Sequence, residues 1–168
     1  MPEYVVKQRV PVTVGLPGEK PAMGEFSLAP QVATRQGSET ILELLNSRVR
    51  VIPIVMSDTD SVLLLTRQSI EWVLPSKEVD PELVCPPPYL VTREESVHVT
   101  FNDGRTASGI IQMELPANMN RVSDFLNTTG DFFPLRTQHG VMLVNKDRVR
   151  NTRVHMPSPP PIYSIDEI

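Results

Sequence analysis

The stretch that decides the fold is Arg121-Val-Ser-Asp-Phe-Leu-Asn127, followed by Phe132-Phe-Pro-Leu135 and Val141-Met-Leu-Val-Asn145. It combines one short helical pattern with two short apolar runs that are typical of strands. The same order of elements occurs earlier in the chain, in Thr40-Ile-Leu-Glu-Leu-Leu-Asn46, Val51-Ile-Pro-Ile54 and Val62-Leu-Leu-Leu-Thr66. Because the apolar positions, an Asn and a Pro recur in the same order, the sequence predicts an internal duplication.

The correspondence extends outward from this stretch into the preceding hairpin. An offset of 85 residues places Val12, Val14, Leu16 and Gly24 on Val97, Val99, Phe101 and Gly109. The offset becomes 81 across the helix and the Pro-containing strand, and 79 across the strand that follows. Offsets change only in connections, where loops absorb deletions. The sequence therefore predicts a lead-in over 1–9, a first β-rich repeat over 10–75, a Pro-rich linker over 76–94, a second repeat over 95–154 and a flexible Pro-rich tail over 155–168.

Each repeat is predicted to form a hairpin, a short helix and three further strands, so the fold class is mainly β (α+β). Ser38 is expected to cap the first helix, because its hydroxyl can accept a bond from an amide of the first turn. Asn46 and Asn127 are expected to end the two helices in the left-handed conformation that Asn tolerates. Each repeat is near the lower size limit for an independent core, so we expect the two to pack together with a pseudo-two-fold relation.

The turn of the second hairpin carries the strongest local signal. Asp103-Gly104 suits a two-residue type I′ turn, because both central residues of that turn need positive φ. Such a turn places Ile110 opposite Val97, one register away from the residues expected in the core. We therefore expect a β-bulge at Gly109, and another at Gly24, to rotate the following residues onto the core face.

The layout of each repeat, a bent hairpin with an Asp-Gly turn followed by a helix and short strands, is similar to that of small Sm-like or SH3-like β-barrels. The resemblance covers Val97 to Val154 best. It implies two tandem barrel or sheet units. The duplicated pattern also resembles bacterial proteins of uncharacterised activity, which implies a bacterial protein but no reaction.

Composition limits the classes of function. The 168 residues carry a formal net charge of −4, whereas a general nucleic-acid surface needs an excess of Lys and Arg. The single cysteine, Cys85, excludes an intramolecular disulfide and a cysteine metal cluster. No apolar run approaches the roughly 20 residues that cross a bilayer. We expect a cytoplasmic protein without a membrane span.

A search for chemistry identifies no catalytic, cofactor-binding or metal-binding residue. The histidines, His98, His139 and His155, lie at no metal-ligand spacing from one another. Asp58 and Asp60 begin an acidic loop that no glycine or later carboxylate completes. Phosphate-binding glycine loops and nucleophile elbows are absent from the sequence. We therefore expect a protein that is not an enzyme and has no cofactor.

Two groups of residues are candidates for contact with a partner. The densest basic stretch contains Lys146, Arg148, Arg150 and Arg153, which suit an acidic partner, a phosphate backbone or, alternatively, a charged edge strand exposed to solvent. The second group is a candidate interaction surface made of Trp72, Asp103 and Arg105. For Trp72 the competing interpretation is packing between the repeats.

The leading hypothesis is a non-enzymatic interaction, regulatory or scaffold module that presents sheet edges and hairpin tips to a protein partner. The alternative is binding of nucleic acid or another anionic ligand through Lys146–Arg153. The sequence is also compatible with a homo-oligomer.

Overall fold

The computed structural model describes residues 8–32, 35–87, 90–114, 116 and 121–155. The predicted lead-in and tail lie outside these residues, apart from Gln8, Arg9 and His155. Within them the strands are β1 (Gln8–Gly15), β2 (Ala22–Leu28), β3 (Val51–Met56), β4 (Val62–Thr66), β5 (Trp72–Pro75), β6 (Arg93–Phe101), β7 (Thr106–Met113), β8 (Phe132–Thr137), β9 (Gly140–Asn145) and β10 (Val149–Val154). The helices are α1 (Ile41–Leu45), α2 (Pro81–Val84) and α3 (Val122–Thr128), with 3₁₀ turns η1 (Arg67–Ser69) and η3 (Lys146–Arg148).

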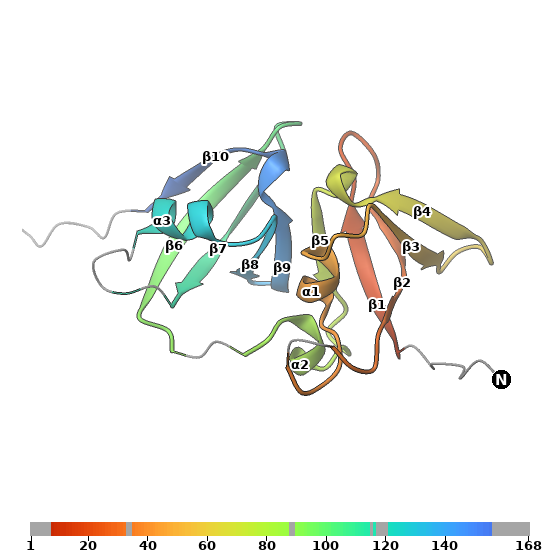
Figure 1. Cartoon of the computed structure of the whole chain (residues 1–168). Helices are drawn as coiled ribbons and strands as arrows, with labels where there is room; N and C mark the ends of the chain where they lie inside the picture. The colour runs from red at the N-terminus through yellow and green to blue at the C-terminus, as the bar shows by residue number, and fades with distance from the viewer. Residues whose placement is uncertain (1–7, 33–34, 88–89, 115, 117–120, 156–168) are drawn as a thin grey trace, which may run out of the picture.

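The strands form one antiparallel ten-stranded sheet in the order β10-β6-β7-β8-β9-β5-β1-β2-β3-β4. It contains two groups with the same internal order, an N-terminal group (β1–β5) and a C-terminal group (β6–β10), visible as two lobes (Figure 1). The mainly β class is confirmed. The sheet stays open, with β4 and β10 as its outermost strands, so of the two predicted forms, barrel or sheet units, the barrel is not confirmed.

The two groups are joined head to tail. The junction pairs β5 with β9, in the register Trp72 to Val144 and Val73 to Leu143. The strand of the N-terminal group that corresponds to β9 is β4, at the far end of the sheet. A two-fold relation requires a second, symmetry-related contact between β10 and β4. Because these two strands are the opposite ends of the sheet, the predicted pseudo-two-fold packing is wrong.

Each group has its own buried core, and side chains of each group pack in or against the core of the other. Phe132 and Leu143, from the C-terminal group, lie in the core of the N-terminal group. Trp72, from the N-terminal group, packs against the core of the C-terminal group. The junction is therefore part of both cores.

The hairpin between β6 and β7 differs from its predicted form. Phe101 N–H donates to Arg105 O over 2.8 Å, and Gly104 has a φ of 90°, so the connection has three residues, with Gly104 in the left-handed conformation. This turn places Val97 opposite Gly109 and brings Ile111 onto the core face without a bulge. Pairing also continues through Gly24 in β2, so both predicted bulges are wrong.

Gly24 and Gly109 are instead required by close approach of a neighbouring strand. A Cβ on Gly24 would lie 2.4 Å from Val55 O in β3, and a Cβ on Gly109 would lie 2.4 Å from Arg136 O in β8. Any other residue would push these strands apart. The two groups thus share the same tight contact between their second and third strands.

The ends of the helices also differ from their predicted form. Thr40, not Ser38, caps α1, in a capping box with Glu43. Asn46 follows α1 with a φ of −94°, and Asn127 lies inside α3, so neither adopts the predicted left-handed cap. The predicted linker contains α2.

Candidate functional site

The largest group of exposed apolar side chains on the sheet lies on β3 and β4. The register pairs Pro53 with Leu64 and places Val51 and Val62 on the same face. Val51 is 47% exposed, Val62 is 55% exposed and Leu64 is 66% exposed. Together with Pro53, which is also exposed, these three residues form the β3–β4 patch. Leu65, which points to the other face, is buried in the N-terminal core.

The edge of β4 is unprotected as well as apolar. β4 is the last strand of the sheet, and the sequence Val62-Leu-Leu-Leu-Thr66 contains no charged residue. Natural edge strands commonly carry Lys, Pro or a bulge, because their free amides and carbonyls pair readily with another chain. An exposed apolar edge of this kind is a candidate contact surface.

The corresponding positions of the C-terminal group are covered. They are Phe132, Pro134, Val141 and Leu143, and Pro134 pairs with Leu143 just as Pro53 pairs with Leu64. Phe132 is 1% exposed and Leu143 is fully buried, both in the N-terminal core, against which Val141 also packs. The same arrangement of side chains is therefore the contact surface at the β5–β9 junction and is open at the other end of the sheet.

Asn46 holds the junction through the backbone of Phe132. Its Nδ2 donates to Phe132 O over 3.1 Å, and its Oδ1 accepts from Phe132 N–H over 2.8 Å. The capped helix α1 positions this side chain, because Asn46 follows its last residue. The sequence predicts a helix cap at Asn46 and gives no sign of this contact between the two groups.

Arg67 and Asn145 add polar contacts at the junction. Arg67 Nη1 lies 2.7 Å from Asp131 Oδ2 of the C-terminal group. Asn145, which is buried, donates through Nδ2 to Ile70 O over 2.8 Å.

A buried carboxyl group, Glu71, lies at the same junction. Its side chain is 1% exposed, and its Oε1 has no hydrogen-bond partner in the described part of the chain. Burial raises the pKa of Glu71 to about 7; its hydrogen bond with Asp103 and the charge of Asp103 act in the same direction, and Arg105 and Arg148 oppose them. Glu71 is thus half protonated near neutral pH.

Asp103 accepts the contacts that hold the β6–β7 turn to the N-terminal group. Burial alone would raise its pKa, but the pKa is lowered by hydrogen bonds from the amide of Arg105, from the side chain of Glu71 and from the amide of Gly18. Arg105 Nη2 also donates to Glu19 O over 2.9 Å. The turn of one group is therefore fastened to the β1–β2 turn of the other.

The three predicted surface residues Trp72, Asp103 and Arg105 all lie at this junction. The indole of Trp72 covers Gly15, where an added Cβ would meet it at 2.2 Å. Trp72 also packs against the core of the C-terminal group, so packing between the groups is the interpretation that the structure supports. These residues are brought together as an internal contact.

Three of the four basic residues donate to separate carbonyl groups of the chain. Lys146 Nζ donates to Leu126 O and Thr129 O, Arg148 Nε to Gln68 O and Arg150 Nη2 to Asn102 O, over 2.6 to 2.8 Å. Lys146 and Arg148 lie in η3 rather than in a strand, and β10 begins after them at Val149. Arg150 and Arg153 remain exposed on β10.

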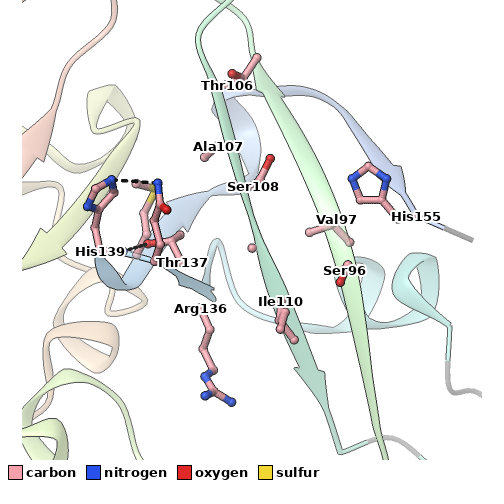
Figure 2. A pocket seen from close by; sticks show the side chains of 13 residues that line it. Ser96, Val97, Thr106, Ala107, Ser108, Ile110, Arg136, Thr137, His139 and His155 are labelled. Atoms are coloured by element: carbon pink, nitrogen blue, oxygen red, sulfur yellow. Dashed lines mark hydrogen bonds between the residues drawn. The ribbon is translucent and has the colours of Figure 1, made fainter. Parts of the chain in front are cut away.

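An open depression of about 790 Å³ lies over β7, bordered by Arg136 and His139 on one side and by Ser96 and His155 on the other (Figure 2). The two histidines lie on opposite sides of β7 in this view. Ser108, one of the residues that line the depression, has its Oγ 2.6 Å from the Nδ1 of His98. Among the described residues no carboxylate is hydrogen-bonded to the other nitrogen of His98, so the pair lacks the orienting group of a catalytic triad.

A second cavity, of about 480 Å³, lies between the two groups and is lined by Leu42, Cys85, Phe125 and Val141 among others. Burial raises the pKa of the Cys85 thiol, which disfavours the reactive thiolate. The four lining residues named here are apolar or weakly polar.

Within the described residues, no three His, Cys, Asp or Glu side chains are grouped so as to hold a metal ion. Of the helices the structure describes, none is long and apolar enough to cross a membrane.

One feature of the sequence points to the β3–β4 patch. Val62 to Leu65 are four consecutive apolar residues, a pattern typical of strands covered on both faces. Among the described residues, contacts cover β4 on one face only, where Leu65 is buried.

Comparisons with protein-family models, with curated proteins and with solved structures found no match to the chain. Function is therefore inferred from the geometry of the chain alone.

Proposed function

We propose that the protein is a non-enzymatic interaction or scaffold module, built from a duplicated five-strand unit, that binds a protein partner through the β3–β4 patch and the edge of β4. The observation that carries this proposal is the exposure of Val51, Val62 and Leu64 on an unprotected edge strand. A partner that adds a strand to β4 would satisfy its backbone groups and cover the patch at the same time.

The proposed duplication is supported by three features that the two groups share. The strand order is the same, a glycine in the second strand of each group meets a carbonyl of the third strand, and Pro53 and Pro134 each pair with a leucine. Duplication explains why an internal contact surface has an exposed counterpart.

The alternative function, binding of nucleic acid or another anion through Lys146, Arg148, Arg150 and Arg153, has less support. Three of the four side chains already donate to carbonyl oxygens of the chain. Phosphate binding needs basic groups that converge on one free surface.

The test is site-specific photo-crosslinking in the cells that produce the protein. A photoreactive residue replaces Leu64 in one variant and Leu90 in another; Leu64 is 66% exposed and Leu90 is 68% exposed, but Leu90 lies outside the sheet. We expect discrete protein adducts at position 64 and none at position 90. Absence of a protein adduct at position 64, or the same adducts at both positions, contradicts the proposal.

A further inference from the structure

We infer that the partner of the β3–β4 patch is a second copy of this chain, whose β10 pairs with β4 and repeats the β5–β9 junction between molecules. This inference rests on the proposed function and names its partner. It follows from the order of the sheet, because β4 corresponds to β9, β10 corresponds to β5, and β4 and β10 are the two outermost strands that the structure describes.

The surface that would receive the patch is present beside β10. At the internal junction, Phe132 and Leu143 enter a core that contains Ile41, Leu45, Ile70 and Val73, all fully buried. The corresponding residues of the C-terminal group are Val122, Leu126, Val149 and Thr152, and these four line a groove of about 460 Å³ between α3 and β10. The C-terminal group thus keeps an open groove at the place where the N-terminal group is filled by its neighbour.

Asn127 offers the same polar contact as Asn46. Both follow the apolar face of the helix in their group, in the segments Ile41–Asn46 and Val122–Asn127. Asn46 binds both backbone groups of Phe132, whose counterpart in the β3–β4 patch is Val51. The side chain of Asn127 is exposed and, unlike that of Asn46, has no hydrogen bond with any described residue. We therefore expect Asn127 of one copy to bind the backbone of Val51 of the next.

The internal junction also fixes the register of the contact. Val73 pairs with Leu143 there. The same register between copies places Thr152 opposite Leu64 and Val154 opposite Val62. Thr152 stands where the N-terminal group has Val73, so this contact is less apolar than the internal one.

The charges differ between the two junctions. The internal junction has an ion pair between Arg67 and Asp131. Their counterparts in a contact between copies are Lys146 and Arg50, which are both positive. Two positive charges at the place of the internal ion pair repel each other and weaken association, and added salt screens this repulsion. We therefore expect the contact between copies to be weaker than the internal junction and to strengthen as ionic strength rises.

Because the two edges differ, the contact is heterologous, and each added copy leaves one β4 and one β10 free. Such contacts generate closed rings or open filaments.

Sedimentation velocity on the full chain tests this inference. We expect the mass to rise with concentration for the unchanged chain, and we expect Leu64→Glu and Thr152→Glu each to weaken association at least about tenfold. Leu90→Glu, at an equally exposed leucine outside the sheet, is the matched control and should associate like the unchanged chain.

Mixing the two blocked variants gives the sharpest result. The Leu64→Glu chain keeps its β10 edge, and the Thr152→Glu chain keeps its β4 edge, so a mixture can form one junction only. We expect each variant alone to be monomeric and the mixture to form a particle of twice the chain mass. An equimolar mixture that stays monomeric where the unchanged chain associates overturns the inference.

Disulfide trapping tests the register. In a Cys85→Ser background, Leu64→Cys with Thr152→Cys should give a ladder of covalent multimers on oxidation, since opposite residues of antiparallel strands suit a disulfide. Met23→Cys with Thr152→Cys is the control, because Met23 is 62% exposed but lies on β2. Equal cross-linking in both pairs overturns the register.

The outcomes separate this inference from the proposed function. A chain that stays monomeric up to millimolar concentration, while position 64 photo-crosslinks a different protein, contradicts the inference and leaves the proposed function in place. Association that survives both Glu substitutions uses another surface and also contradicts the inference.

Discussion

Leu64 and Leu143 occupy the same place in their strand groups but have opposite surroundings. Each lies on the fourth strand of its group and pairs with a proline of the third strand. Leu143 is fully buried, whereas Leu64 is 66% exposed. The difference arises from what lies beyond the strand: β5 covers β9, and no described strand covers β4.

This comparison shows that the contact surface of an internal junction can be repeated as an open surface in the same chain. If the junction is a contact that the unit makes generally, substitutions on the covered side lower the stability of the chain, and those on the open side change association only. Four predictions test that distinction.

The largest expected effect is at the leucine pair itself. Leu143→Ala removes a buried side chain and leaves a cavity, so it should lower the free energy of unfolding by about 2 to 5 kcal/mol. Leu64→Ala should change it by less than about 0.5 kcal/mol, because the side chain is exposed. Urea unfolding of dilute protein measures both. Equal losses would show that Leu64 is already covered in the dilute chain.

The next effect concerns Glu71, whose counterpart in the C-terminal group is the exposed Arg150. The pKa of Glu71 is raised from 4.5 to about 7 in the folded chain, so the folded state binds more protons than the unfolded state between these values. This contribution to stability is fully present below pH 4.5 and is lost as pH rises through 7, by about 3 kcal/mol in all.

Glu71→Gln should remove this dependence, because the amide does not titrate. The variant should be more stable than the unchanged chain at pH 8 and close to it at pH 5, as measured by urea unfolding at both values. A difference that is the same at both pH values would show that Glu71 titrates normally.

A smaller effect is expected for the asparagines. Asn46→Ala leaves the amide and carbonyl of Phe132 without their partner at a part-buried site, which should cost about 1 to 3 kcal/mol. Asn127→Ala should leave the stability of the dilute chain unchanged but weaken its association. Thermal or urea unfolding of both variants measures the two losses of stability. Similar losses would contradict the difference expected between the covered Asn46 and the exposed Asn127.

The smallest effect is expected for the ion pair at the rim of the junction. Asp131→Asn removes the contact with Arg67, and because the Asp131 side chain is 53% exposed the loss should be less than about 1 kcal/mol. The loss should shrink further at high salt. A larger, salt-independent loss would mean that Asp131 holds the junction in another way.

Much of the fold could be predicted from the sequence because short-range patterns decide it. Valines that alternate with polar residues or proline, such as Val12 and Val14 or Val97 and Val99, are typical of strands and lie in β1 and β6. The short helical pattern in Thr40–Asn46 likewise contains α1. The turn at Asp103-Gly104 was located correctly but given two residues instead of three. That single residue changes the register, so the bulges at Gly24 and Gly109 were inferred to correct an offset that does not exist.

The candidate site was harder to predict because it depends on pairing between distant strands. Val62-Leu-Leu-Leu-Thr66 and Val141-Met-Leu-Val-Asn145 are alike in sequence, and only the tertiary structure decides which of them is covered. The roles of Asn46 and Glu71 likewise depend on residues more than 30 positions away in sequence, Phe132 and Asp103. The basic stretch was visible in the sequence, but the carbonyl oxygens that engage it were not.

Amide hydrogen exchange of the full chain at low and high protein concentration tests the central claim most directly. The account predicts that Val62–Thr66 and Val149–Val154 gain protection together as concentration rises, while β5 and β9 are protected at both concentrations. Exchange in β4 and β10 that does not change with concentration, or protection that appears at only one of these two strands, would contradict it.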